Sequence, residues 1–116
     1  MKRGDIYWAT LSPRSGSEQS GRRPVIILSH DAFNQTPGWR SIIVVPVSTS
    51  TTQARRGPTV VALSAGTAGL PGESCAVCHQ ITTLDRSKLT DKIGEIPQDI
   101  LTLVEQALLS AVDIRR

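Results

Sequence analysis

The 116-residue sequence has few aromatic residues, two cysteines, one methionine and no long hydrophobic run. Aromatic side chains make up only 3% of the chain, so its core must consist mainly of Val, Ile, Leu and Ala. Such a core is modest, and an oligomer would bury more apolar surface. No apolar segment approaches the ~20 residues that a membrane-spanning helix needs. The first five residues lead into an expected strand rather than a signal-peptide core, so we expect a cytoplasmic protein without membrane association, its cysteines remaining thiols.

Several catalytic signatures are also missing. The sequence contains no P-loop, nucleophile elbow, dinucleotide fingerprint or paired-aspartate metal site. Any catalysis is therefore expected to proceed without a metal or cofactor. The remaining composition, 39% hydrophobic and 20% charged, indicates one globular domain over residues 1–116. The net charge of +3 favours polyanions only weakly, but arginines gather in two loop regions and would form a positive face.

The hydrophobic pattern predicts short strands followed by one helix. Expected strands cover residues 5–11, 25–28, 41–48, 59–63, 73–84 and 90–96. An irregular connection is expected at 30–40, and a short helical turn at 86–89. Such a series of strands closed by a helix predicts a small twisted β-barrel or half-barrel.

From Pro97 onward the hydrophobic period changes to that of an amphipathic helix, with Pro97 in its first turn. The expected core stripe consists of Ile100, Leu103, Val104, Ala107, Leu108, Ala111 and Val112. Leu101 and Leu109 widen this stripe, which indicates a second contact surface such as a partner subunit.

The segment Gly16–Ser29 has the features of a functional loop. A polar stretch rich in Ser, Gly and Arg leads through Pro24 into the apolar run of residues 25–28. Arg23 should therefore sit where a loop meets a rigid sheet, and its planar fork of donors suits phosphate oxygens. The hydroxyl-rich residues 48–52 would supply further donors if the two apolar strands are neighbours, although Ser and Thr are also common in plain turns. Arg55 and Arg56 form either a phosphate-binding turn or a solvated one.

Cys75-Ala76-Val77-Cys78-His79 matches the C-x-x-C-H pattern of covalent haem attachment. A strand would point Cys75 and Cys78 to opposite faces, which disfavours a shared ligand or a disulfide. The only methionine, Met1, is a poor second axial ligand. We therefore expect two small buried or semi-buried thiols within a strand, and no bound metal or haem.

The pattern G-S-E-Q-x-G-x-R-P at residues 16–24, with Arg3-Gly4-Asp5-Ile6-Tyr7-Trp8, resembles the MazF/PemK/Kid family of bacterial toxin ribonucleases. Further matches follow in order at residues 45–49, 80–84 and 88–94. The resemblance implies a mainly β, SH3-like small barrel of the Kid/CcdB/MazF type with a C-terminal helix, forming a homodimer. It also implies a type II toxin–antitoxin component that cleaves single-stranded mRNA at specific sequences, leaving 2′,3′-cyclic phosphate and 5′-hydroxyl ends.

Single-stranded RNA carries its own nucleophile, the 2′-hydroxyl, so the protein needs mainly to position it and stabilise charge. We expect Arg23 to clamp the scissile phosphate, with Ser48 or Thr49 donating a second hydrogen bond. Ser48 stands where the family usually has threonine, which leaves that choice open. Glu18 is the nearest candidate to accept the 2′-hydroxyl proton. Expected RNA contacts, each of which could instead be a turn or surface residue, are Ser17, Gln19, Thr49, Arg55 and Gln80.

The expected partner is an antitoxin with an acidic, partly disordered segment that covers the arginine-bearing loops. His79 precedes Gln80 where many relatives carry an acid. Because this difference could change the base preference, we predict no RNA cleavage sequence. A rival function is gyrase binding, because gyrase-poisoning toxins share this fold. Those toxins end in Trp-Gly-Ile, whereas this chain ends in Asp113-Ile114-Arg115-Arg116.

Overall fold

The structure is a computed structural model that describes residues 1–11, 21–50 and 57–115. Its strands are β1 (Asp5–Leu11), β2 (Gly21–Ile27), β3 (Ser41–Ser48), β4 (Val60–Leu63), β5 (Ser74–Val77), β6 (Thr82–Asp85) and β7 (Leu89–Glu95). Its helices are α1 (Asp31–Asn34) and α3 (Gln98–Ala111), with 3-10 turns η1 (Gly57–Thr59), η2 (Thr67–Gly69), η3 (Cys78–Gln80) and η4 (Arg86–Lys88). The predicted mainly β fold with a C-terminal helix is confirmed.

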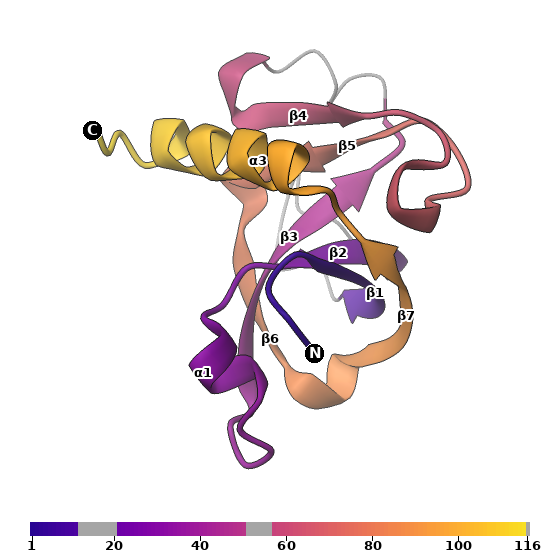
Figure 1. Cartoon of the computed structure of the whole chain (residues 1–116), viewed down its shortest axis with the longest axis vertical. Coiled ribbons are helices and arrows are strands. Elements are labelled where there is room, and N and C mark those ends of the chain that lie inside the picture. Colours follow the sequence, from indigo (N-terminus) through magenta and orange to yellow (C-terminus); the bar gives the residue numbers. More distant parts are fainter. Residues whose placement is uncertain (12–20, 51–56, 116) are drawn as a thin grey trace.

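The strands form one antiparallel arrangement in the order β4-β5-β3-β2-β1-β7, with β6 also paired to β3. β3 is the central strand: its first half pairs with β6, its last two residues pair with β5, and its other edge pairs with β2. On the edge of β3 that faces β6 and β5, Pro46 lies between the two paired stretches. Proline has no backbone N–H, and at this position none is needed for a hydrogen bond to either strand. Figure 1 shows the result, with α3 lying beside β4 and β5 and α1 at the other end of β3.

The single strand predicted at 73–84 is wrong, because β5, η3 and β6 replace it. Both strands pair with β3, on either side of Pro46. The chain must turn between them to follow β3 as it passes from one part of the sheet to the other. The turn η3 (Cys78–Gln80) contains neither glycine nor proline, so no local signal in the sequence marks a break there.

β2 begins at Gly21, four residues earlier than predicted. Residues 21–26 pair with β1, whereas only residues 25–27 also pair with β3. The polar first half of β2 is therefore a strand paired on one edge, which explains why hydrophobicity did not indicate it. Arg23 accordingly lies within a strand rather than at the end of a loop.

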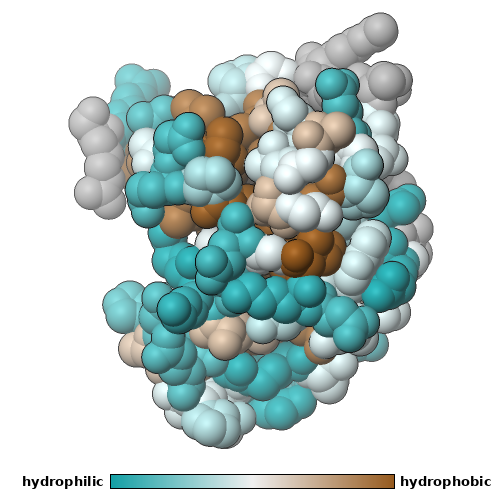
Figure 2. Space-filling view, turned by 45° about the vertical axis from the view of Figure 1, so that its right-hand side comes forward, coloured by the Kyte–Doolittle hydropathy of each residue, from teal (hydrophilic) through white to brown (hydrophobic). Residues whose placement is uncertain are grey.

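α3 confirms the predicted helix and most of its predicted core face, because Val104 and Ala107 are buried and Ile100 and Leu108 pack against the core. Leu101, Val104 and Ala107 are buried, whereas Leu103 and Val112 are 48% and 54% exposed. Leu101, which was predicted to widen the stripe, is therefore buried in place of Leu103. Both positions fit a helical period, so the packing against the sheet decides which of the two leucines is buried. Pro97 is the N-cap residue rather than part of the first turn. Figure 2 shows more hydrophobic surface in the upper and middle parts of the molecule than in its lower part, which is mostly hydrophilic.

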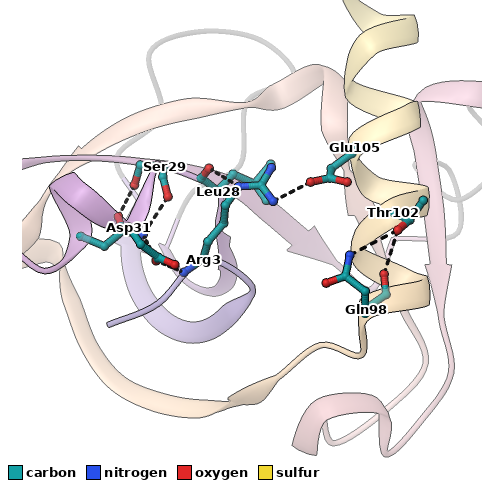
Figure 3. Close-up of polar contacts among 8 residues, drawn as sticks. Arg3, Leu28, Ser29, Asp31, Gln98, Thr102 and Glu105 are labelled. Atoms are coloured by element: carbon teal, nitrogen blue, oxygen red, sulfur yellow. Dashed lines mark hydrogen bonds and ion pairs between the residues drawn. The ribbon is translucent and has the colours of Figure 1, made fainter. Parts of the chain in front are cut away.

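The connection predicted to be irregular at 30–40 contains the short helix α1, and His30 accepts a hydrogen bond from the Ala32 amide as its N-cap. Arg3 joins this end of the molecule to α3. Its guanidinium donates to the Leu28 carbonyl and to Glu105, as Figure 3 shows. The first residues of the chain are thereby held against both the sheet and the C-terminal helix.

Candidate active site

Arg23 projects from a strand whose continuation is fixed in the core. It pairs with Ala9 of β1, and the residues after Pro24 are fully buried. The Arg23 side chain itself is exposed. It lines a cavity of about 110 Å³, whose other lining residues include Trp8, Arg22, Thr49, Leu70, Gly72 and Ser74. Arg23 is thus fixed by the pairing of its backbone within β2, while the exposed residue lines the cavity.

The two candidate hydroxyls at the end of β3 have different environments. Ser48 is only 5% exposed, and its Oγ accepts a hydrogen bond of 3.0 Å from the Ser50 amide. The Ser48 carbonyl accepts a weak bond from the Cys75 thiol at 3.5 Å. Thr49 is exposed and lines the same cavity as Arg23. Thr49 therefore lines the same cavity as Arg23, whereas the Ser48 hydroxyl stabilises the backbone at the end of β3.

A second hollow of about 240 Å³ adjoins the first, and Thr49 and Ser74 line both. Its floor is a row of directly opposed residues across three strands: Ser48 of β3, Cys75 of β5 and Ala62 of β4. Opposed residues of antiparallel strands point to the same face. The site thus consists of a cationic cavity and a hydroxyl-lined hollow, separated by a shared wall.

Arg22 brings a second cation to the site, and the sequence analysis assigned it no role. Its guanidinium carbon lies 4.3 Å from the centre of the Trp8 ring, and it forms an exposed ion pair of 3.4 Å with Asp91. Exposed contacts of both kinds are worth at most ~1 kcal/mol each. Arg22 can therefore turn toward a bound phosphate at low cost. The only feature of the sequence that could have indicated this role of Arg22 is that it directly precedes Arg23.

The loop at residues 70–72 supplies the opposite wall of the cationic cavity. It follows η2, which packs backbone to backbone against β7. A Cβ placed on Gly94 would lie 2.2 Å from the Ala68 carbonyl oxygen, and one on Gly69 would lie 2.9 Å from that of Ile93. Because Gly69 and Gly94 have no side chains, η2 and β7 can lie in direct backbone contact, and this contact fixes the position of the loop at residues 70–72. No local pattern in the sequence indicates it.

The remaining predicted site residues either lie outside the described part of the chain or line neither hollow. Ser17, Glu18, Gln19 and Arg55 lie outside the described residues. Gln80 lies in η3, which packs against α3, and it lines neither hollow. Its role in RNA binding stays a prediction.

Cys75 and Cys78 are free and buried, as predicted, although Cys78 begins η3 instead of continuing the strand. Burial raises the pKa of both thiols, that of Cys78 to about 12. Both are therefore neutral near pH 7, and a neutral buried thiol is a poor nucleophile and metal ligand. His79 instead forms a 2.8 Å hydrogen bond through Nδ1 with the Thr59 hydroxyl.

Within residues 1–11, 21–50 and 57–115, no group of His, Cys, Asp and Glu is arranged to hold a metal ion. The helices in these ranges are also too short or too polar to cross a bilayer.

Comparison with known proteins gives the same family as the motifs. The model of the PemK-like, MazF-like toxins of type II toxin–antitoxin systems matches residues 2–112. Endoribonuclease EndoA of Bacillus subtilis is 37% identical over 108 residues, which cover 93% of this chain and 90% of EndoA. Endoribonuclease MazF6 of Mycobacterium tuberculosis is 35% identical over 114 residues, 98% of each chain.

Solved structures agree. A crystal structure of MazF from Deinococcus radiodurans superposes with a TM-score of 0.77 at 30% identity, covering 97% of this chain and 96% of that one. MazF in a MazE–MazF crystal structure from the same organism gives 0.73 at 29% identity, covering 99% and 97%. The fold is thus that of a MazF-type toxin, with an arginine-bearing cavity beside the hydroxyl-rich end of β3. The chain belongs to the PemK/MazF family of toxins of type II toxin–antitoxin systems.

Proposed function

We propose that this chain is the toxin of a type II toxin–antitoxin system and acts as an endoribonuclease on single-stranded mRNA in the cytoplasm. The observation that carries the proposal is the cavity shared by Arg23 and Thr49, on a scaffold whose curated relatives are named endoribonucleases. A rigid cation beside a hydroxyl donor suits the charge that develops on phosphate during transfer. No observation favours gyrase binding.

In the proposed reaction the RNA 2′-hydroxyl oxygen attacks the adjacent phosphorus and loses its proton to a base. Glu18 is the proposed base, since arginine with a pKa above ~12 is a poor proton acceptor. The bond from phosphorus to the 5′-oxygen breaks, and that oxygen takes a proton from water. The products are a 2′,3′-cyclic phosphate and a 5′-hydroxyl.

Arg23 stabilises the negative charge of the phosphorane, and Arg22 adds positive potential along the strand of RNA. Both cations come from the protein, so the charge stabilisation requires no metal ion. Pro24 and the buried residues after it hold Arg23 in place before substrate arrives, which lowers the cost of reorganisation during the reaction.

The test is incubation with a defined single-stranded RNA in excess EDTA, followed by analysis of both new ends. We expect cleavage with cyclic phosphate and 5′-hydroxyl ends at an undiminished rate. Cleavage that stops in EDTA and returns with magnesium would contradict the mechanism, as would 5′-phosphate products. A 2′-O-methyl RNA of the same sequence is the matched control and should stay intact because it lacks the nucleophile.

Substitutions of Thr49 and Ser48 at the end of β3 should have different effects, one on catalysis and the other on stability. Thr49→Val keeps the side-chain shape and removes the donor, so we expect kcat to fall about tenfold, the worth of one hydrogen bond. Ser48→Ala removes the acceptor of the Ser50 amide, so we expect a loss of about 1 kcal/mol in unfolding free energy and a smaller change in kcat. Steady-state kinetics and urea unfolding measure the two effects. The opposite result would assign the catalytic hydroxyl to Ser48.

The proposed antitoxin presents an acidic, partly disordered segment to the arginine-bearing cavity, because opposite charge would both attract and block it. A solved structure from Deinococcus radiodurans contains MazE together with MazF. We also propose a homodimer. Leu103 is exposed beside a groove of about 410 Å³ between β4 and α3, and β4 is an edge strand. A second copy would cover both the apolar groove and the open edge.

A further inference from the structure

We propose that the hydroxyl-lined hollow beside the cationic cavity holds one base next to the scissile phosphate, and that Glu73 selects bases whose edge carries hydrogen-bond donors. This inference rests on the proposed RNA cleavage. It gives the site a preference against uracil at that position.

The shape and chemistry of the hollow fit a single base. Its volume of about 240 Å³ is below the ~300–1,000 Å³ of pockets for drug-sized ligands, so it suits one ring system rather than two. Val60 and Ala62 of β4 form an apolar wall for a ring face, whereas Ser64, Glu73 and Ser74 supply polar atoms for a ring edge. Bases of single-stranded RNA are read in this way, by their faces and their hydrogen-bonding edges.

The position of the hollow ties it to the phosphate. Thr49 and Ser74 form the wall between the hollow and the cavity that contains Arg23. A phosphate held by Arg23 and Thr49 would therefore place a neighbouring base over the row of Ser48, Cys75 and Ala62. Of these two hollows, Arg23 lines the cationic cavity and Glu73 lines the other, so phosphate and base would meet groups of opposite charge.

Glu73 is the only carboxylate among the described residues that line either hollow. It directly precedes β5, is exposed, and takes part in no ion pair within the described part of the chain. A carboxylate this close to bound phosphates repels them unless it accepts hydrogen bonds from the ligand. Its placement therefore indicates a donor on the bound base.

An ionised carboxylate only accepts hydrogen bonds. Guanine offers N1–H and N2–H₂ on its Watson–Crick edge, cytosine offers N4–H₂, and adenine offers N6–H₂. Uracil offers one N–H flanked by two carbonyl oxygens, which would repel the carboxylate. Glu73 should therefore favour the first three bases over uracil by about tenfold to a hundredfold, the usual discrimination of a good side-chain–base pair.

The experiment uses a random-sequence RNA pool, with sequencing across every cleavage junction. Wild type should show uracil depleted about tenfold or more at one position flanking the cut. Glu73→Gln, which is nearly isosteric and can also donate, should remove most of that depletion while still cleaving. Asp99→Asn, on the exposed first turn of α3, makes the same change of charge away from both hollows and should leave the profile unchanged.

A second pool with every 2′-hydroxyl methylated separates this inference from the proposed function, because it reports binding without cleavage. Uracil depletion among bound sequences that depends on Glu73 supports the base site even if the natural RNA is not cut. Cleavage that shows the same base profile in wild type and Glu73→Gln overturns the base site and leaves the ribonuclease function standing.

Discussion

Replacing Arg23 by alanine is expected to lower kcat about 10²–10³-fold and to leave the fold intact. Loss of one preorganised donor that faces developing charge typically has an effect of this size. The Arg23 side chain is exposed and packs into no core cluster, so its removal creates no cavity. Single-turnover cleavage of a defined RNA measures the rate, and circular dichroism with thermal unfolding checks the fold.

Arg23→Lys is the matched variant. It keeps the charge but replaces a planar fork by a point charge, so we expect a rate between those of wild type and Arg23→Ala. Arg22→Ala serves as a second comparison, because Arg22 rests on Trp8 and should affect RNA affinity more than kcat. Full activity of Arg23→Ala would refute the proposed role of this guanidinium.

Replacing Gly94 by alanine is expected to destabilise the whole domain by about 3 kcal/mol and to lower Tm by roughly 10 °C. The added Cβ would lie 2.2 Å from the Ala68 carbonyl oxygen and 2.8 Å from its carbonyl carbon, distances that no folded chain tolerates. Both partners are backbone, so either η2 or β7 must move. β7 is paired to β1 through Ile6 and Gly94, which makes that movement costly.

The same variant should also weaken RNA cleavage, because η2 leads into Leu70 and Gly72 in the wall of the cationic cavity. Gly38→Ala is the control, since a Cβ there meets no atom within 4 Å and the residue does not need a positive φ. Calorimetry should find it within ~0.5 kcal/mol of wild type. Equal stability of the two variants would show that η2 does not rest on β7 in this way.

Much of the fold could be predicted from local patterns. The strand at residues 5–11, the apolar strand at 41–48 and the helix after Pro97 follow from periods of two and 3.6 residues. The ordered motifs gave the family, which the comparisons confirm. Patterns failed where an element is polar but paired, as in the first half of β2, or where a turn lacks glycine and proline, as at η3.

The candidate site was predicted only in part. Arg23 and the hydroxyls at the end of β3 follow from a loop that meets a buried strand. Trp8, Arg22, Glu73 and the wall at residues 70–72 were missed, because they reach the site from separate strands and loops. A charged residue in a turn has the same local signature whether it faces solvent or a substrate.

The sequence by itself determined the strands at residues 5–11 and 41–48, the helix after Pro97 and the family to which the chain belongs. These properties depend on neighbours along the chain, whose spacing is fixed by covalent geometry. Only the tertiary structure decided that Leu101 rather than Leu103 of α3 is buried, that Thr49 rather than Ser48 shares the cavity of Arg23, and that a carboxylate lines the adjoining hollow. These depend on contacts between distant segments, which pack in one arrangement because the interior leaves no room for another.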